Sequence, residues 1–260
     1  MGSVSDTAAF QLLGCDFSSA PSRRKPITLA VGRADRGRVV LEGVEHFETL
    51  DAWSQRLAAP GRWVGGFDLP FGLPRELVTT LGWPTDWAAC MAHYKGLSRE
   101  SIREAFAAFC DARPVGGKFA HRATDGPAGS SPTRLPGLFE GDGSRVGLEA
   151  YPGLLARSVL GTVSYKSDDK ARQTPGRLIA RKTLINALEN GQAPLLQAVG
   201  LRLRLTHAQR DALADDASGD RLDAVLCLLQ AAWAEQQHRA GVPRWGLPVF
   251  DPLEGWIVTA

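Results

Sequence analysis

Short apolar stretches alternate with turn-forming residues over the first part of the chain. Three of them, Gln11 to Phe17, Ile27 to Gly32 and Arg38 to Val44, predict β-strands because SSAPSRRKP and RADRG separate them. A helix is expected from about Leu50 to Ala58. RWVGGFD then predicts a fourth strand, which ends at LPFGLP because two prolines prevent its continuation. This order predicts an antiparallel three-strand meander, a crossover helix and further parallel strands, hence a mixed α/β sheet.

The pattern changes over residues 84–144. Two expected helices, Thr85 to Tyr94 and Ser98 to Ala112, lead into a loop rich in Gly, Ser and Pro from Pro114 to Gly143. We interpret this stretch as a helical and loop insertion within a single domain of residues 8–260. After it, RVGLEAYP predicts a strand. Further helices are expected after Pro152, from Pro175 to about Glu189, from His207 to Asp215 and from Gly219 to Gln237, before an extended tail.

Composition narrows the class of protein. The chain is 44% hydrophobic and has a net charge of +2, so any binding of nucleic acid must use a local basic patch. The four cysteines lie far apart without a CxxC pair or a secretory segment, which predicts reduced thiols in a cytoplasmic protein. Cys90 and His93 have the spacing of two metal ligands, but a buried structural thiol is the preferred interpretation. No apolar run predicts a membrane role, and a homo-oligomer is neither predicted nor excluded.

Two aspartates occupy equivalent places in the predicted sheet. Asp16 ends the apolar strand QLLGCD, and Asp68 ends the strand RWVGGFD. Ligands of open α/β sheets bind outside the carboxyl ends of strands, so these two carboxylates point to one site. The alternative for each is the start of a turn or a helix cap.

A second pair of aspartates opens the apolar helix SGDRLDAVLCLLQAAWA. Asp220 and Asp223 are three residues apart and share one helical face. Asp220 has an alternative role as a helix cap, whereas Asp223 lies one turn deeper among apolar residues. Two carboxylates about 4 Å apart repel by roughly 4 kcal/mol at an effective dielectric of about 20. A divalent cation would relieve both the burial and the repulsion.

Further residues are candidates for the same site. Glu149 ends the strand in GLEAYPG, and it is either a fifth catalytic carboxylate or an ordinary strand-end residue. Oxygen ligands almost without histidine favour Mg²⁺ or Mn²⁺. His121 is a candidate for protonating a leaving group. The candidates for contacting phosphate, each with a solvated loop or helix face as its alternative, are Lys118, Arg122, Tyr165, Lys166, Arg177 and Arg181.

These motifs together resemble the family of predicted ribonuclease H-like nucleases catalogued as domain of unknown function 429. The resemblance rests on the order of GCDFSSAPSRRK, GFDLPFGLP, KFAHRATD, LEAYPG, SYK, GDRLDAVLCLLQAAWA and EGWI, and it spans most of the chain. It implies a ribonuclease H-like fold in which Asp16, Asp68 and Asp223 hold two metal ions, with Asp220 as a fourth ligand. Glu149 has no firm counterpart in that pattern.

The resulting hypothesis is a metal-dependent nuclease that hydrolyses phosphodiester bonds of DNA or RNA. One alternative is a nucleotide-dependent kinase or ATPase of the actin-like branch, although neither a downstream Gly-rich adenosine loop nor a GxxxxGK[ST] motif is present. Another is a nucleic-acid-binding module with a weak metal site on the same fold.

Overall fold

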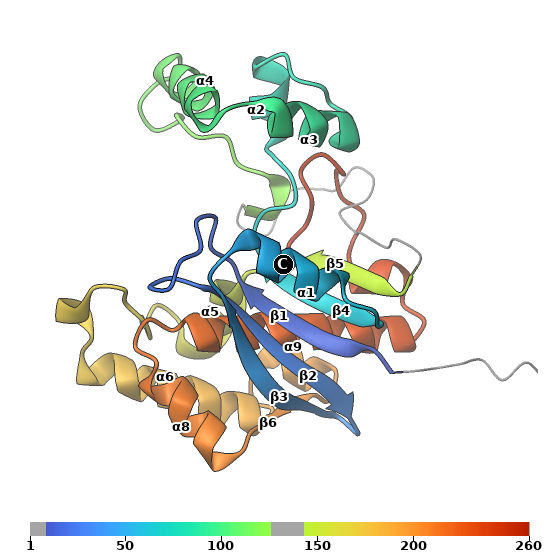
Figure 1. Ribbon diagram of the computed structural model, residues 1–260, viewed down its shortest axis with the longest axis vertical. Coiled ribbons are helices and arrows are strands. Elements are labelled where there is room, and N and C mark those ends of the chain that lie inside the picture. Colours follow the sequence, from blue (N-terminus) through green and yellow to red (C-terminus); the bar gives the residue numbers. More distant parts are fainter. Residues whose placement is uncertain (1–8, 126–142, 260) are drawn as a thin grey trace, which may run out of the picture. The chain divides into compact units, whose positions relative to one another are not determined.

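The computed structural model describes residues 9–125 and 143–259, which form two compact units (Figure 1). The first contains residues 9–69, 143–247 and Thr259, and the second contains residues 70–125 and 248–258. Part of the Gly-rich loop expected between Pro114 and Gly143 lies outside the described residues.

The first unit is built on a six-stranded mixed sheet with the strand order β5-β4-β1-β2-β3-β6. Its central meander β1-β2-β3 is antiparallel, whereas β1 pairs with β4, β4 with β5 and β3 with β6 in parallel. The predicted mixed α/β sheet is therefore confirmed. The strand bounds are β1 Gln11–Asp16, β2 Ile27–Asp35, β3 Arg38–Phe47, β4 Trp63–Asp68, β5 Arg145–Glu149 and β6 Arg202–Arg204. The short β6 was not predicted, because three residues with alternating burial carry little pattern.

Helices cover both faces of this sheet. The crossover helix α1 (Leu50–Ala58) begins at Thr49, whose hydroxyl accepts a hydrogen bond from the Ala52 amide. Trp53 of α1 packs against Phe17 and Phe67, with ring centroids 5.3 and 6.2 Å away. Figure 1 shows α1 on the near face and α9 on the far face. The other α-helices of this unit are α5 Pro152–Leu160, α6 Pro175–Glu189, α7 Pro194–Ala198, α8 His207–Asp215 and α9 Asp220–Arg239.

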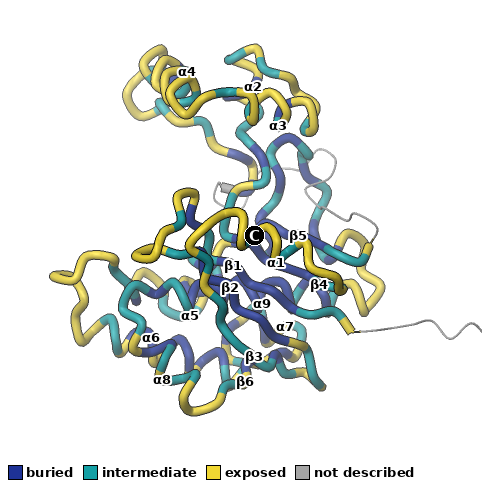
Figure 2. Tube along the Cα trace, viewed as in Figure 1, coloured by how far each residue is buried: buried dark blue, intermediate teal, exposed yellow. Residues whose placement is uncertain are grey.

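The long helix α9 lies in direct backbone contact with the central strands, and Figure 2 shows it buried over most of its length. A Cβ added to Gly14 of β1 would lie 2.1 Å from the Ala224 carbonyl oxygen. One added to Gly66 of β4 would lie 2.5 Å from the Cys227 carbonyl oxygen. The glycines therefore allow the helix to approach closer than any side chain would permit. This packing fixes the start of α9 at the carboxyl ends of β1 and β4.

The second unit is small and helical. Its α-helices are α2 Arg75–Thr80, α3 Trp87–Gly96 and α4 Arg99–Asp111, and its core contains Val78, Cys90 and Leu253. The chain tail, residues 248–258, packs in this unit as irregular structure with short turns and forms no strand, so the predicted extended tail is wrong. The Arg75 guanidinium holds the tail through the Asp251 carboxylate, with 2.7 Å between Nη2 and Oδ1.

All four cysteines are free, and Cys90 is a buried core residue, as predicted. Across residues 9–125 and 143–259, no helix is both long and apolar enough to cross a bilayer.

Candidate functional site

Asp16 and Asp68 lie side by side at the carboxyl ends of two parallel strands. They are register partners of the β1–β4 pair, where neighbouring strands are about 4.8 Å apart. Gly14 and Gly66, two residues earlier in each strand, both face α9. Since side chains alternate along a strand, Asp16 and Asp68 start from that same face. The structure thus brings the two carboxylates together as the sequence predicted.

The first turn of α9 adds two more carboxylates. Asp220 is its first residue, and Asp223 is completely buried. Gly219 precedes the helix with a φ of 83°, a left-handed conformation that suits glycine. A Cβ on Gly219 would also lie 2.7 Å from the Lys166 Cβ atom. Gly219 therefore both starts the helix and admits the Lys166 side chain beside it.

Asp223 already has two hydrogen-bonding partners. The Tyr165 hydroxyl donates to its Oδ1 atom, and the Lys166 ammonium donates to its Oδ2 atom. The ammonium of Lys166 and the hydroxyl of Tyr165 compensate this buried carboxylate, so its burial alone does not require a divalent cation. The role of Asp223 as a metal ligand stays a prediction. Lys166 and Tyr165 are thus parts of the site, as expected, but through a contact with Asp223.

Buried Arg181 supports the segment that carries Tyr165 and Lys166. Its Nη1 atom donates to the Tyr165 carbonyl oxygen at 2.8 Å, and its Nε atom donates to the Ala214 carbonyl oxygen at 2.7 Å. Arg181 is only 4% exposed. The expectation that it lies on a charged, phosphate-facing helix surface is therefore wrong, and its position fits a structural role. Arg177 is half-buried and donates to the Arg172 carbonyl oxygen.

The carboxylates raise one another's pKa values. Burial, followed by the charges of Asp223 and Asp220, raises the pKa of Asp16 to about 8. Burial and the charge of Asp223 raise the pKa of Asp68 to about 6. For Asp223 itself, burial raises the pKa against the opposing effects of Lys166 and Tyr165. The charge of Lys166 lowers both pKa values and so offsets part of this repulsion, but within the described residues neither Asp16 nor Asp68 accepts a hydrogen bond or forms an ion pair.

A cavity of about 340 Å³ opens beside Asp16 and Asp220. Its chemistry is mixed: three carboxylates, two ammonium groups and three serine hydroxyls line it. Lys25 at the rim forms an ion pair with Asp168, with 3.1 Å between Nζ and Oδ2. Such a lining suits a ligand that carries phosphate and ribose-like hydroxyl groups. The residues that line it are Asp16, Phe17, Lys25, Ser164, Lys166, Ser167, Asp168, Ser218 and Asp220.

Glu149 is close to this site but starts from a different face of the sheet. It pairs in register with Phe67, the neighbour of Asp68, and it is 3% exposed. Its charge contributes to the raised pKa of Asp68. The structure therefore brings Glu149 near Asp68 without giving it the same orientation.

Three predicted residues belong to the second unit. Arg122 is buried there, and its Nη1 atom donates to the Glu254 carbonyl oxygen at 3.1 Å. His121 is exposed, and Lys118 is half-buried. The expected roles of these three residues in substrate binding or proton transfer stay predictions.

The fit of a divalent cation depends on which oxygens are available. Within residues 9–125 and 143–259, no three Asp, Glu, His or Cys side chains are arranged to hold a metal ion as they stand. Both oxygens of Asp223 are engaged. Asp16 and Asp68 nevertheless offer adjacent, mutually repelling carboxylates, and such oxygens are the ligands that Mg²⁺ and Mn²⁺ prefer. The donor set is therefore chemically suitable, with Asp16 and Asp68 at its centre.

The comparison of this chain with protein-family models, curated proteins and solved structures found no match.

Proposed function

We propose that the first unit is a metal-dependent phosphodiester hydrolase of the ribonuclease H-like type. The observation that carries this proposal is the pair Asp16 and Asp68, set side by side with pKa values raised to about 8 and about 6. Raised carboxylate pKa values are typical of functional sites, because repulsion kept in a fold has a stability cost that function can explain.

The topology supports the same proposal. The order β5-β4-β1-β2-β3 contains the predicted antiparallel meander, and the fourth strand pairs in parallel with the first. Acids stand on the first strand, on the fourth strand and on a later helix packed against both. This is the arrangement that the resemblance assigns to the metal-binding carboxylates.

Asp16 and Asp68, with Asp220 beside them, are the residues that we propose to hold Mg²⁺ or Mn²⁺. When bound, such an ion activates water and stabilises a leaving oxygen. Asp223 holds the Lys166 ammonium in place, and Lys166 lines the cavity beside Asp16. Lys166 is therefore placed to attract the charge of a substrate phosphate.

The decisive experiment compares the protein with Asp16→Asn on a panel of DNA, RNA and hybrid substrates in Mn²⁺. We expect cleavage by the parent and a loss of at least about 100-fold in the variant, the scale of an essential electrostatic group. Asp211→Asn, an exposed carboxylate on α8, is the matched control and should cleave like the parent. Circular dichroism checks that each variant is folded. Equal cleavage by Asp16→Asn would refute the proposal.

The cavity favours one alternative, because 340 Å³ of space with two lysines also suits a single nucleotide. In that case the protein would be an ATPase or kinase of the actin-like branch. Metal-dependent ATP turnover without cleavage of any nucleic acid would support it. Calorimetry with Mn²⁺ tests the further alternative, a catalytically weak nucleic-acid-binding module, for which ion binding without any turnover is expected.

A further inference from the structure

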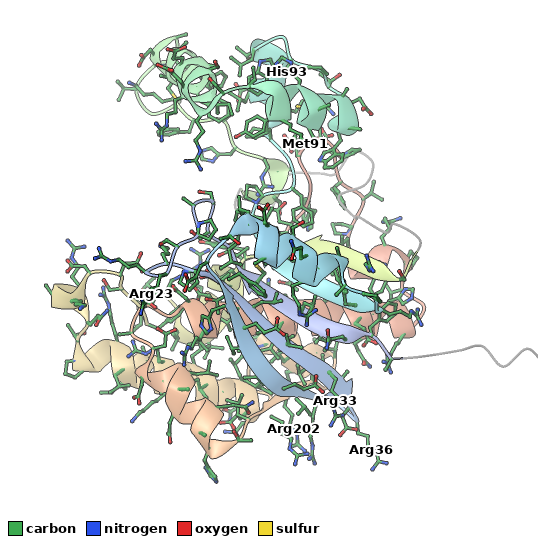
Figure 3. All side chains as sticks on the ribbon, in the orientation of Figure 1. Arg23, Arg33, Arg36, Met91, His93 and Arg202 are labelled. Carbon is green, nitrogen blue, oxygen red and sulfur yellow. The ribbon has the colours of Figure 1, made fainter. Side chains whose placement is uncertain are left out.

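Arginines gather at the edge of the sheet formed by β2, β3 and β6. We call this group the arginine edge and define it as Arg33, Arg36, Arg38, Arg202 and Arg204. Figure 3 shows Arg33, Arg36 and Arg202 at the same end of the first unit. Arg38 and Arg202 are register partners on the parallel strands β3 and β6, and Val40 pairs with Arg204. Because Leu203 and Val39 point into the core, these three arginines share the opposite face of the sheet.

The carboxylates at this edge do not neutralise most of these arginines. Arg33 forms ion pairs with both nearby acids: its Nε atom lies 3.1 Å from the Glu42 carboxylate, and its Nη1 atom lies 3.8 Å from the Asp35 carboxylate. Within the described part of the chain, Arg36, Arg38, Arg202 and Arg204 form no ion pair. Arg38 has Asp35 as its register partner on β2, but Arg202 lies on its other side, and like charges on neighbouring strands destabilise a sheet.

The turn between β2 and β3 also places an arginine where the backbone does not favour one. Arg36 and Gly37 occupy the two central positions of this hairpin, with φ values of 49° and 77°. Such a turn favours Asn followed by Gly, whereas arginine is disfavoured at a positive φ. Arg36 therefore occupies a turn position where the backbone conformation favours a different residue, and its guanidinium is exposed there.

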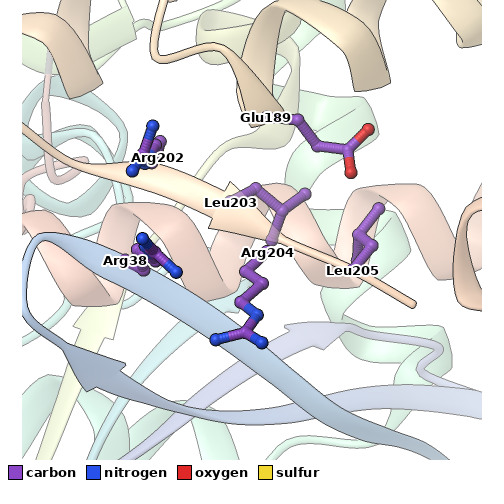
Figure 4. A pocket seen from close by; sticks show the side chains of 6 residues that line it. All are labelled: Arg38, Glu189, Arg202, Leu203, Arg204 and Leu205. Carbon is purple, nitrogen blue, oxygen red and sulfur yellow. The ribbon is translucent and has the colours of Figure 1, made fainter.

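Arg38, Arg202 and Arg204 line an open depression of about 330 Å³ (Figure 4). Glu189 also lines it, but the Arg210 Nη1 atom lies 2.9 Å from its Oε2 atom and compensates its charge. Arg202 and Arg204 are two residues apart on one face, which separates their Cα atoms by about 6.6 Å. Neighbouring strands add Arg38 at about 4.8 Å from Arg202. The result is a row of guanidinium groups over a shallow surface.

We propose that the arginine edge binds the phosphate backbone of a nucleic acid. Guanidinium groups bind phosphate with two parallel hydrogen bonds, and a row of them matches a repeating anion better than a single one. No aromatic side chain lines the depression, so the binding is independent of base sequence. A membrane surface fits less well, because none of the large exposed hydrophobic side chains of the described residues belongs to β2, β3 or β6.

This surface is separate from the carboxylate site. In the antiparallel meander, Asp16 pairs with Thr28 at the start of β2, whereas Arg38 pairs with Asp35 at its end. The two features therefore lie at opposite ends of the sheet, and the arginine edge is a second contact that holds a long substrate. The inference does not need the carboxylates to be catalytic, so the two proposals fail independently.

The test is fluorescence anisotropy of a labelled single-stranded oligonucleotide in EDTA, across a series of salt concentrations. The double variant Arg202→Ala/Arg204→Ala should lose two phosphate contacts. Each contact contributes about 0.7 to the slope of log affinity against log salt for single strands, so the slope should fall by about 1.4. If the variant and the parent bind equally at 1 M salt, this change in slope makes the affinity of the variant about 25-fold lower than that of the parent at 0.1 M salt.

A second variant guards against misfolding. Arg36→Asn places a residue that the turn prefers, so it should stay folded while the slope falls by about 0.7. The control Lys95→Ala/Arg103→Ala removes two exposed charges in the second unit and should bind like the parent. Unchanged affinity in Arg202→Ala/Arg204→Ala, or an equal loss in the control, would overturn the proposal. The proposal would also be overturned if Arg202→Ala/Arg204→Ala lost affinity for vesicles containing 30% phosphatidylserine but not for the oligonucleotide. Because the assay contains EDTA and measures binding alone, its outcome does not depend on whether the carboxylates are catalytic.

Discussion

Replacing Lys166 by methionine tests how the buried Asp223 carboxylate is compensated. Asp223 is completely buried, whereas the Lys166 side chain is 42% exposed. Removing one partner of a buried ion pair destabilises a protein by about 3–5 kcal/mol, because an uncompensated charge remains. Since water reaches the Lys166 side of the pair, we expect a smaller loss of about 2–3 kcal/mol in Lys166→Met at pH 8.

The assay is equilibrium unfolding in urea with EDTA present, followed by tryptophan fluorescence. Lys182→Met, an exposed lysine on α6, is the control and should change the free energy of unfolding by less than about 0.5 kcal/mol. The double variant Lys166→Met/Asp223→Asn removes the orphaned charge, so it should recover about half or more of the loss. The pairing would be refuted if Lys166→Met unfolded like the parent, or if the double variant were no more stable than Lys166→Met.

Adding Mn²⁺ to the same samples connects this pair to the proposed function. A cation bound only by the folded state stabilises it by RT ln(1 + [L]/Kd). In Lys166→Met the ammonium no longer competes for the carboxylates, so Mn²⁺ should raise the free energy of unfolding more than in the parent. An equal Mn²⁺ effect in both proteins would show that Lys166 and the ion do not share the cluster.

Three other predictions follow from the packing and electrostatics. Gly14→Ala should lower the free energy of unfolding by about 3 kcal/mol or more in urea titrations, because its Cβ atom would lie 2.1 Å from the backbone of α9. The control Gly43→Ala, which has open space around it, should be neutral or slightly stabilising. Arg181→Met should cost about 2–4 kcal/mol by the same measurement, since two carbonyl oxygens lose their donor. The free energy of unfolding without divalent ions should fall as pH rises from about 4 to about 8, because folded Asp16 binds a proton more tightly than unfolded Asp16. In Asp16→Asn this fall should be smaller between about pH 6 and 8, and an unchanged slope would contradict the assignment.

The parts of the fold that local patterns determine were predictable from sequence. Each central strand has its own apolar run and its own turn residues, and the crossover helix forces β4 to run parallel to β1. Since Asp16 and Asp68 end equivalent strands, their meeting followed from topology alone. Their register pairing required no knowledge of side-chain contacts.

Contacts between residues distant in sequence were not predictable in the same way. Tyr165 and Lys166 reach Asp223 across more than 50 residues, and no periodicity encodes that pairing. Arg181 has helical spacing from Arg177 and so was expected on one charged face, yet its burial depends on the carbonyl oxygens of other segments. The one available signal was Gly219, whose place before the helix leaves room for Lys166.

The same repulsion that supports a functional role makes the carboxylate site unfavourable for stability. One pKa unit corresponds to about 1.4 kcal/mol, so a pKa of about 8 in Asp16, discounted for its partial exposure, implies a penalty of roughly 2–3 kcal/mol at pH 8. Asp16→Asn should therefore unfold at higher urea than the parent while losing activity. A fold kept for stability alone would have replaced this aspartate, since asparagine preserves its shape without its charge. Gain of stability together with loss of cleavage in one variant would thus separate a functional carboxylate from a structural one.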